Sequence, residues 1–291
     1  MCMEAGMSDL TERAMGALMG AAVGDALGVT FEFEDAADIP RERFKMVGGG
    51  PFDFAPGAAS DDTDLLHAVL RSYTGRNQFD ADGAVDNMLG WLDRKPPDVG
   101  MQTRYALSCW RDGSTPPDDE DAQGNGGLMR AAAHALACDD GVLAARFAAS
   151  DTRLTHPSDA AADCSAFYAA SVWWAIRGLP PVDSLGRAGD GGPTFKPYEA
   201  PKRSGSGHCL HSLRLALWAF TTAETYEAGM DAVIRAGGDT DTNATIAGAL
   251  LGARFGLAGI PPDWLGGLET CNRDRLGVEA ARLRIDRRPN A

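Results

Sequence analysis

The stretch AMGALMGAAVGDALG, residues 14–28, decides the fold class. Its small apolar side chains recur three and four residues apart, which is the spacing of one helix face. These side chains are Ala14, Leu18, Ala21, Ala22 and Ala26. The same stretch contains the pattern GxxxGxxxG at residues 20–28. No strand precedes these glycines, so we interpret them as a surface for close helix packing rather than as a nucleotide-binding loop.

The helical period continues along the chain. A second stripe lies at residues 65–73, and alanine-rich amphipathic windows lie near 81–93, 102–110, 128–138, 141–149, 159–177, 208–221, 225–236 and 243–255. Only a short stretch near Val29–Phe33 suits an extended conformation. We predict an all-α protein of roughly ten or more helices, with long loops at 45–60, 112–127 and 181–207. We expect one domain over residues 1–291, with a flexible N-terminus at residues 1–11.

The composition restricts the possible functions. The 291 residues include 27 Lys and Arg against 41 Asp and Glu, a net charge of −14, so we expect neither nucleic-acid binding nor docking on anionic membranes. No window holds the ~18 uncharged apolar residues of a membrane span, and the N-terminus MCMEAGMSDLTER lacks a secretory signal. We therefore expect a cytoplasmic protein whose six scattered cysteines are free thiols and form no zinc site.

An acidic turn, Ser60-Asp61-Asp62-Thr63-Asp64, directly precedes the apolar stripe that begins at Leu65. A helix N-cap explains Ser60 or one of the aspartates, because one side-chain oxygen satisfies the free N–H groups. It does not explain three carboxylates in four positions, which repel one another unless a cation lies among them. The turn therefore indicates a cation site.

A second acidic turn, at residues 237–243, precedes another apolar helix. Asp239, Asp241 and Asn243 imitate positions 1, 3 and 5 of a calcium loop. Ala244 stands where that loop needs glycine and Leu250 where it needs glutamate, so we reject an EF-hand.

Together the two turns predict one site built from both. They offer only carboxylate and hydroxyl oxygens, which favours Mg²⁺ or Mn²⁺ over zinc. Four or five carboxylates exceed what one Mg²⁺ normally takes from a protein, whereas two ions about 3.5–4 Å apart would balance them.

Two weaker segments join this prediction. The loop at residues 124–130, GNGGLMR, opens a helix where backbone N–H groups can hold a phosphate, although an ordinary helix-start turn explains it about as well. Thr155-His156-Pro157 precedes another helix, where a lone histidine is more often a cap or a surface residue than a catalyst.

Taken together and in this order, these segments resemble the ADP-ribosylglycohydrolase family along nearly the whole chain. The order of the two acidic turns is the specific part of the resemblance, and the glycine-rich start alone is weak. The segments that carry it are residues 16–28, 31–33, 45–50, 56–57, 60–63, 97–100, 124–130, 155–156, 195–198 and 237–242. The resemblance implies a compact orthogonal multi-helix bundle with a dinuclear Mg²⁺ or Mn²⁺ centre in a cleft.

The resemblance also implies roles, carried over residue by residue. The metal ligands would be Ser60, Asp61, Asp62, Asp239, Asp241 and Thr242. The active-site carboxylates would be Glu32 and Asp98, and the resemblance does not divide acid and base between them. The residues of the ADP-ribose pocket would be Gly124, Asn125, Gly126, Met129 and His156.

The chain departs from the family pattern at two positions. Ser60 replaces the usual threonine and keeps the hydroxyl. His208, which we also expect to bind substrate, stands where the family often has a tyrosine near the ribose. The second departure bears on the substrate subclass more than on the activity.

The implied reaction is hydrolysis of the bond between ADP-ribose and a modified protein side chain, with ADP-ribose as product. The segments at residues 45–50 and 195–198 closely resemble those of the family's type member and favour arginine linkage. The alternatives are serine-linked ADP-ribose, O-acetyl-ADP-ribose, a modified nucleobase, or non-catalytic ADP-ribose binding. A different class remains open at this point, a helical interaction protein whose acidic turns are only caps.

Overall fold

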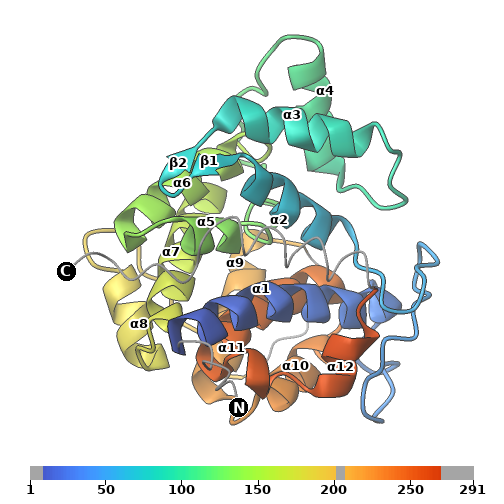
Figure 1. Cartoon of the computed structure of the whole chain (residues 1–291). Coiled ribbons are helices and arrows are strands. Elements are labelled where there is room, and N and C mark those ends of the chain that lie inside the picture. The colour runs from blue at the N-terminus through green and yellow to red at the C-terminus, as the bar shows by residue number, and fades with distance from the viewer. Residues whose placement is uncertain (1–8, 201–206, 270–291) are drawn as a thin grey trace, which may run out of the picture.

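The computed structural model describes residues 9–200 and 207–269. These residues are mostly helical, as predicted (Figure 1). The α-helices are α1 (Asp9–Gly28), α2 (Asp61–Arg71), α3 (Ala81–Leu92), α4 (Met101–Arg111), α5 (Ala132–Ala137), α6 (Gly141–Arg153), α7 (Asp159–Ile176), α8 (Pro181–Ala188), α9 (Cys209–Thr222), α10 (Tyr226–Ile234), α11 (Thr240–Phe255) and α12 (Pro262–Gly267). The remaining elements are the 3-10 helices η1 (Val29–Phe31) and η2 (Leu257–Gly259) and the antiparallel strands β1 (Tyr73–Gly75) and β2 (Gln78–Phe79).

Helices α1 and α11 form the central pair of the fold, and the predicted close helix packing is confirmed. A Cβ atom on Gly20 would lie 2.4 Å from the carbonyl oxygen of Gly248, and one on Gly24 would lie 2.2 Å from that of Ala244. Because no larger side chain fits at such distances, glycine allows the two backbones to touch. The end of α1 therefore meets the start of α11, where a Cβ atom on Gly28 would lie 2.4 Å from the Cα atom of Asp241.

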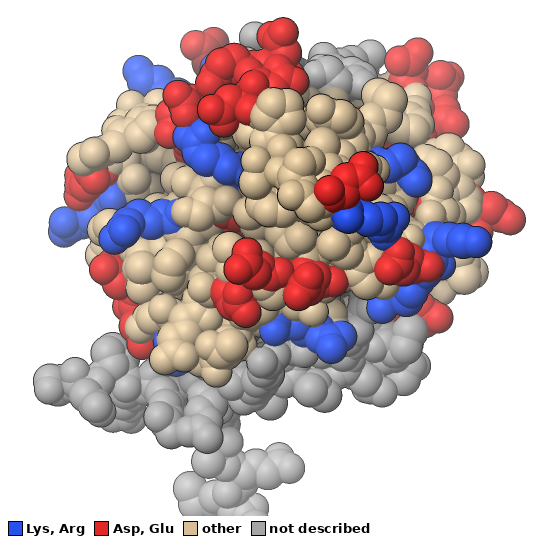
Figure 2. Space-filling view, turned by 90° about the horizontal axis from the view of Figure 1, so that it is seen from above, with Lys and Arg blue, Asp and Glu red and all other residues tan. Residues whose placement is uncertain are grey.

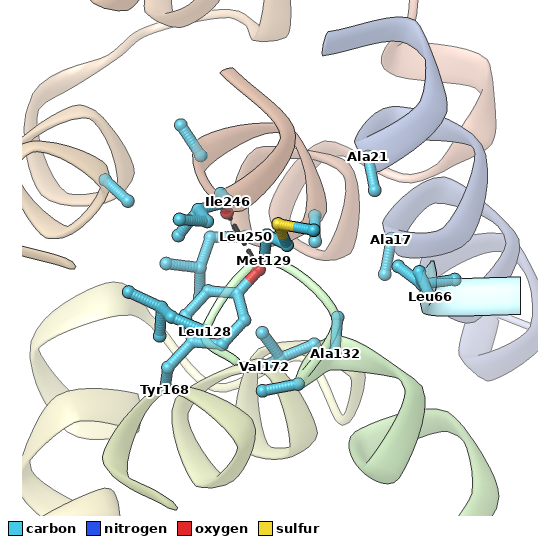
Figure 3. Close-up of a cluster of buried hydrophobic side chains, with 14 of the residues drawn as sticks. Ala17, Ala21, Leu66, Leu128, Met129, Ala132, Tyr168, Val172, Ile246 and Leu250 are labelled. Atoms are coloured by element: carbon cyan, nitrogen blue, oxygen red, sulfur yellow. Dashed lines mark hydrogen bonds between the residues drawn. The ribbon is translucent and has the colours of Figure 1, made fainter. Parts of the chain in front are cut away.

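The core between α7 and α11 anchors the loop at residues 124–130, the GNG loop, which leads to α5. Leu128 and Met129 are buried and lie between these two helices (Figure 3). In the same cluster, the Tyr168 hydroxyl donates a hydrogen bond to the carbonyl oxygen of Ile246 at 2.9 Å. Leu128 and Met129, the apolar residues that follow Gly126 in the chain, thereby hold the loop against α11.

Some local predictions were wrong. Residues 181–188 form α8 instead of a loop, because Pro181 suits the first helical position and Leu185 packs on the core. The stretch near Val29–Phe33 contains η1 and is not extended. The strands lie instead at 73–79, joined through Asn77 at φ +61°, a conformation that asparagine tolerates. Helix α5 begins at Ala132, later than predicted.

The predicted flexible N-terminus lies outside the described residues over positions 1–8. Residues 9–11 are not a flexible arm but the first turn of α1. The Asp9 carboxylate accepts a hydrogen bond from Arg13 Nε at 3.1 Å, a pair four residues apart that favours the helix.

The segment Asp9–Phe31 is long and apolar enough to cross a membrane by length and composition alone. Its most apolar 18-residue window is 83% buried within the protein, so a core position accounts for this composition. At the surface, Figure 2 shows Lys and Arg side chains scattered among Asp and Glu side chains on the described part of one face.

Candidate metal centre

Five buried carboxylates meet where the end of α1, the segment after η1 and the starts of α2 and α11 come together. In Asp25, Asp62 and Asp241, one carboxylate oxygen from each lies within 4.8 Å of the others. The same is true of Glu32, Asp239 and Asp241. Asp241 belongs to both groups, so the two groups are adjacent and share one carboxylate.

Asp25 is a residue of this site that the sequence reasoning missed. It is fully buried and accepts hydrogen bonds from the backbone N–H groups of Ser60 and Thr63 at 2.9 Å and 3.0 Å. The Thr63 hydroxyl also donates to it, at 2.6 Å. Asp25 thereby fastens the acidic turn before α2 to α1. A lone acid on the apolar stripe of α1 was the available signal.

Asp62 accepts hydrogen bonds from two hydroxyl groups, one at the start of α2 and one at the start of α11. Ser60 Oγ donates to Asp62 Oδ2 at 3.1 Å, and Thr242 Oγ1 donates to the same oxygen at 3.2 Å. Ser60 is also the N-cap of α2, so the cap interpretation was correct for this residue. Asp62 Oδ1 and Glu32 Oε2 are buried and have no hydrogen-bond partner among the described residues.

Asp239 occupies the N-cap position of α11, but its side chain makes no cap hydrogen bond. It accepts instead from Asn125 Nδ2 at 2.7 Å, which joins the second acidic turn to the GNG loop. The backbone of Gly238 exchanges hydrogen bonds with the segment that follows Glu32, through Phe33 N and Glu34 O at 2.7 and 2.9 Å. A role as helix cap alone therefore does not explain Asp239.

The pKa values of these carboxylates are raised, which means that their ionised forms are unstable without a cation nearby. Burial raises the pKa of Glu32 to about 8, and the charges of Asp98, Asp239 and Asp25 add to this effect. Burial, followed by repulsion from neighbouring carboxylates, raises the pKa of Asp62 and Asp241 well above the ordinary value. Buried carboxylates with unpartnered oxygens are the donor set that a hard divalent cation prefers, so the residues present fit a metal ion.

A cavity of about 440 Å³ opens above the carboxylates. Ten of the residues predicted for the site line it: Glu32, Asp61, Asp98, Gly124, Asn125, Gly126, Met129, His156, Asp239 and Thr242. Burial raises the pKa of Asp61 well above its ordinary value, and the charge of Asp98 adds to this effect. The structure thus brings together residues from distant parts of the sequence, while the role assigned to each of them stays a prediction.

Three predicted ligands and His208 do not line this cavity. Ser60, Asp62 and Asp241 are buried among the carboxylates described above. His208 is the N-cap of α9, where its Nδ1 accepts from Leu210 N at 3.1 Å. Its neighbour Gly207 lines the cavity, and a Cβ atom there would lie 2.8 Å from Asp239 Oδ2.

Comparison with known proteins gives consistent matches. A family model described as ADP-ribosylglycohydrolase matches residues 7–290. The ADP-ribosylarginine hydrolase Tri1 of Pseudomonas putida (strain GB-1) is 31% identical over 281 residues, covering 87% of this chain and 73% of that protein. The ADP-ribosyl-dinitrogen reductase glycohydrolase of Rhodospirillum rubrum is 30% identical over 273 residues, covering 89% and 90%.

A solved structure is similar over almost its whole length. It is an ADP-ribosylglycohydrolase-related protein complex, with a TM-score of 0.83 and 32% sequence identity. The similarity covers 97% of this chain and 100% of that chain. The chain therefore belongs to the ADP-ribosylglycohydrolase family and is a hydrolase of an ADP-ribosylated substrate.

Proposed function

We propose that the protein removes mono-ADP-ribose from modified arginine side chains with the help of two divalent cations, Mg²⁺ or Mn²⁺. The observation that carries the proposal is the pair of carboxylate groups sharing Asp241 beneath a cavity lined by Glu32 and Asp98. Two adjacent groups with one shared carboxylate suit two neighbouring cations better than one.

The two carboxylate groups support one proposed position for each cation. Asp25, Asp62 and Asp241 would hold one cation, and Glu32, Asp239 and Asp241 would hold the other. When bound, such cations orient ribose hydroxyl groups and lower the pKa of a water molecule. They also neutralise carboxylates whose mutual repulsion otherwise opposes folding.

The cavity walls supply the other functions of a hydrolase site. Asp98 lines the cavity and belongs to neither carboxylate group, so its carboxyl group is the one that can exchange a proton with water or with the leaving group. Gly124 and Gly126 also line the cavity, and neither glycine carries a side chain that would keep a ligand from the backbone. A guanidine leaving group needs a proton, and burial raises the pKa of Asp98, which favours a carboxyl group that can give one.

The choice of arginine is supported by the matched hydrolases rather than by a contact in the cavity. One of them, 31% identical to this chain, is an ADP-ribosylarginine hydrolase. Serine-linked ADP-ribose and O-acetyl-ADP-ribose would use the same carboxylates, and they are the second candidates.

The test is release of ADP-ribose from an arginine-ADP-ribosylated protein, with Mg²⁺ or Mn²⁺ and with EDTA. We expect release that depends on the metal and is lost in Asp239→Ala. A protein ADP-ribosylated on serine and O-acetyl-ADP-ribose serve as parallel substrates. Release from these alone would contradict arginine linkage, and tight binding of ADP-ribose without any release would indicate a binding protein.

A further inference from the structure

A buried guanidinium group that the proposed reaction does not use lies beneath the GNG loop. Arg130 is 0% exposed. Its Nε donates to Asp151 Oδ2 at 2.9 Å, and its Nη1 donates to the carbonyl oxygen of Gly126 at 2.9 Å. Its Nη2 donates to the Asp151 carbonyl oxygen and to Thr155 Oγ1, both at 2.9 Å. One side chain thus ties the GNG loop to the segment that carries His156.

These contacts fix the direction of the next hydrogen bond. Thr155 Oγ1 accepts from Arg130, which can only donate, and it lies 2.9 Å from His156 Nδ1. Among the described residues, no other acceptor for the Thr155 hydroxyl hydrogen is found. If Nδ1 carried the ring proton, this buried hydroxyl group would have no acceptor, which is costly. The hydroxyl therefore donates to Nδ1, and the ring proton lies on Nε2.

The Nε2 edge of His156 faces the GNG loop and the cavity. A Cβ atom on Gly124 would lie 2.9 Å from Nε2, and one on Gly126 would lie 2.7 Å from Cε1. The two glycines of the motif are therefore needed to make room for this ring. In the part of the chain that the structure describes, Nε2 has no hydrogen-bond acceptor, although the residue is only 3% exposed and lines the cavity.

We propose that Arg130 and Thr155, backed by Asp151, are positioning residues that hold His156 as a neutral Nε2–H donor to an oxygen of the bound ADP-ribosyl group. The other tautomer would present a lone pair to that oxygen and repel it. Burial, together with the charge of Arg130, lowers the pKa of His156 to about 3, in keeping with a neutral ring. The inference rests on the proposed function, since it takes the ADP-ribosyl group as the occupant of the cavity.

The test uses Thr155→Val, which removes the hydroxyl group and keeps the shape. Thr152→Val is the matched control, because Thr152 is equally buried and its Oγ1 has no hydrogen-bond partner among the described residues. Thr155→Ser is the rescue variant, since it restores the hydroxyl. The first readout is the ¹⁵N NMR signature of the His156 ring in ligand-free protein, which reports the tautomer without any catalytic step.

We expect a single Nε2–H tautomer in the wild type, in Thr152→Val and in Thr155→Ser, and a mixture of tautomers in Thr155→Val. A wild-type ring protonated on Nδ1, or an unchanged spectrum in Thr155→Val, would overturn the inference. The second readout is calorimetric binding of ADP-ribose, for which we expect about tenfold weaker affinity in Thr155→Val. Equal affinities in Thr155→Val and Thr152→Val would also overturn it.

The two readouts separate this inference from the proposed function. Failure of the wild type to release ADP-ribose from any substrate would contradict the proposed function, while the ring spectrum would still decide the tautomer. If the wild type has the Nε2–H tautomer but Thr155→Val, Thr155→Ser and Thr152→Val all bind ADP-ribose as well as the wild type does, the proposed role of Thr155 is overturned. The proposed hydrolase function is not affected by that result.

Discussion

At the scale of single residues, the candidate metal centre depends on buried polar groups that are fixed by hydrogen bonds. Asp25 illustrates the point, because it accepts three hydrogen bonds from the turn before α2 and also faces Asp62 and Asp241. The acidic turns could be read from the sequence, since clustered carboxylates are unusual there. Asp25 left only a weak signal, a single acid in an apolar helix, because its role depends on neighbours that the fold supplies.

His156 makes a testable contribution to acid sensitivity. Its pKa is about 3 in the folded protein, so the unfolded chain binds a proton between pH 6.5 and 3 that the folded protein does not. The folding free energy that depends on a neutral His156 is therefore fully present above pH 6.5 and is lost as the pH falls from 6.5 toward 3. We expect the unfolding free energy of the wild type to fall by about 3 kcal/mol more than that of His156→Gln between pH 7 and pH 4. Urea unfolding in EDTA measures both, and parallel pH profiles would contradict this account.

At the scale of elements, the site depends on one helix pair. The glycines of α1 let it touch α11, and this contact sets the end of one helix, with Asp25, beside the start of the other, with Asp241. The sequence predicted close packing from the glycine spacing. It did not name the partner, because any helix with small residues at the same spacing would fit the same stripe.

Gly24→Ala tests this contact. The added Cβ atom would lie 2.2 Å from the carbonyl oxygen of Ala244, so the helices must separate. We expect a loss of about 2–3 kcal/mol in the free energy of unfolding, measured with urea. The control is Gly90→Ala in α3, where a Cβ atom meets nothing within 4 Å. It should stabilise the protein by about 0.5–1 kcal/mol, and equal effects of the two changes would refute the packing argument.

The short elements were the least predictable. Helix α8 has only 8 residues and contains Gly186, so its sequence is typical of a loop. The helix is stabilised by the packing of Leu185 against the core. The hairpin of β1 and β2 is too short to show an alternating pattern. In both cases tertiary contacts outweigh the local propensities on which prediction from sequence relies.

At the scale of the whole molecule, the central issue is charge. The protein has a net charge of −14, and its cavity is lined by carboxylates, yet the proposed ligand carries a pyrophosphate. Cations in the site and backbone N–H groups of the loop would dominate at contact distance, because more distant surface charges are screened by salt. The buried carboxylates repel one another unless a cation lies among them, so binding of metal and folding should be linked.

Saturation with Mn²⁺ should raise the stability of the entire protein. At one hundred times its Kd, each bound ion contributes about 2.7 kcal/mol, which corresponds to a rise of roughly 5–10 °C in the unfolding temperature. Differential scanning calorimetry with Mn²⁺ and with EDTA measures the gain. Asp53→Asn, at an exposed site with φ +54°, should keep the gain, and Asp241→Asn should lose it. An equal gain in both variants would place the metal elsewhere.

The most direct test of the two-cation centre is the number of Mn²⁺ ions bound per chain, counted by isothermal titration calorimetry. Asp241 belongs to both carboxylate groups, whereas Glu32 belongs to one. The account predicts two ions for the wild type, one for Glu32→Gln and none held tightly by Asp241→Asn. A single ion in the wild type, or a second ion that survives the loss of Asp241, would contradict it.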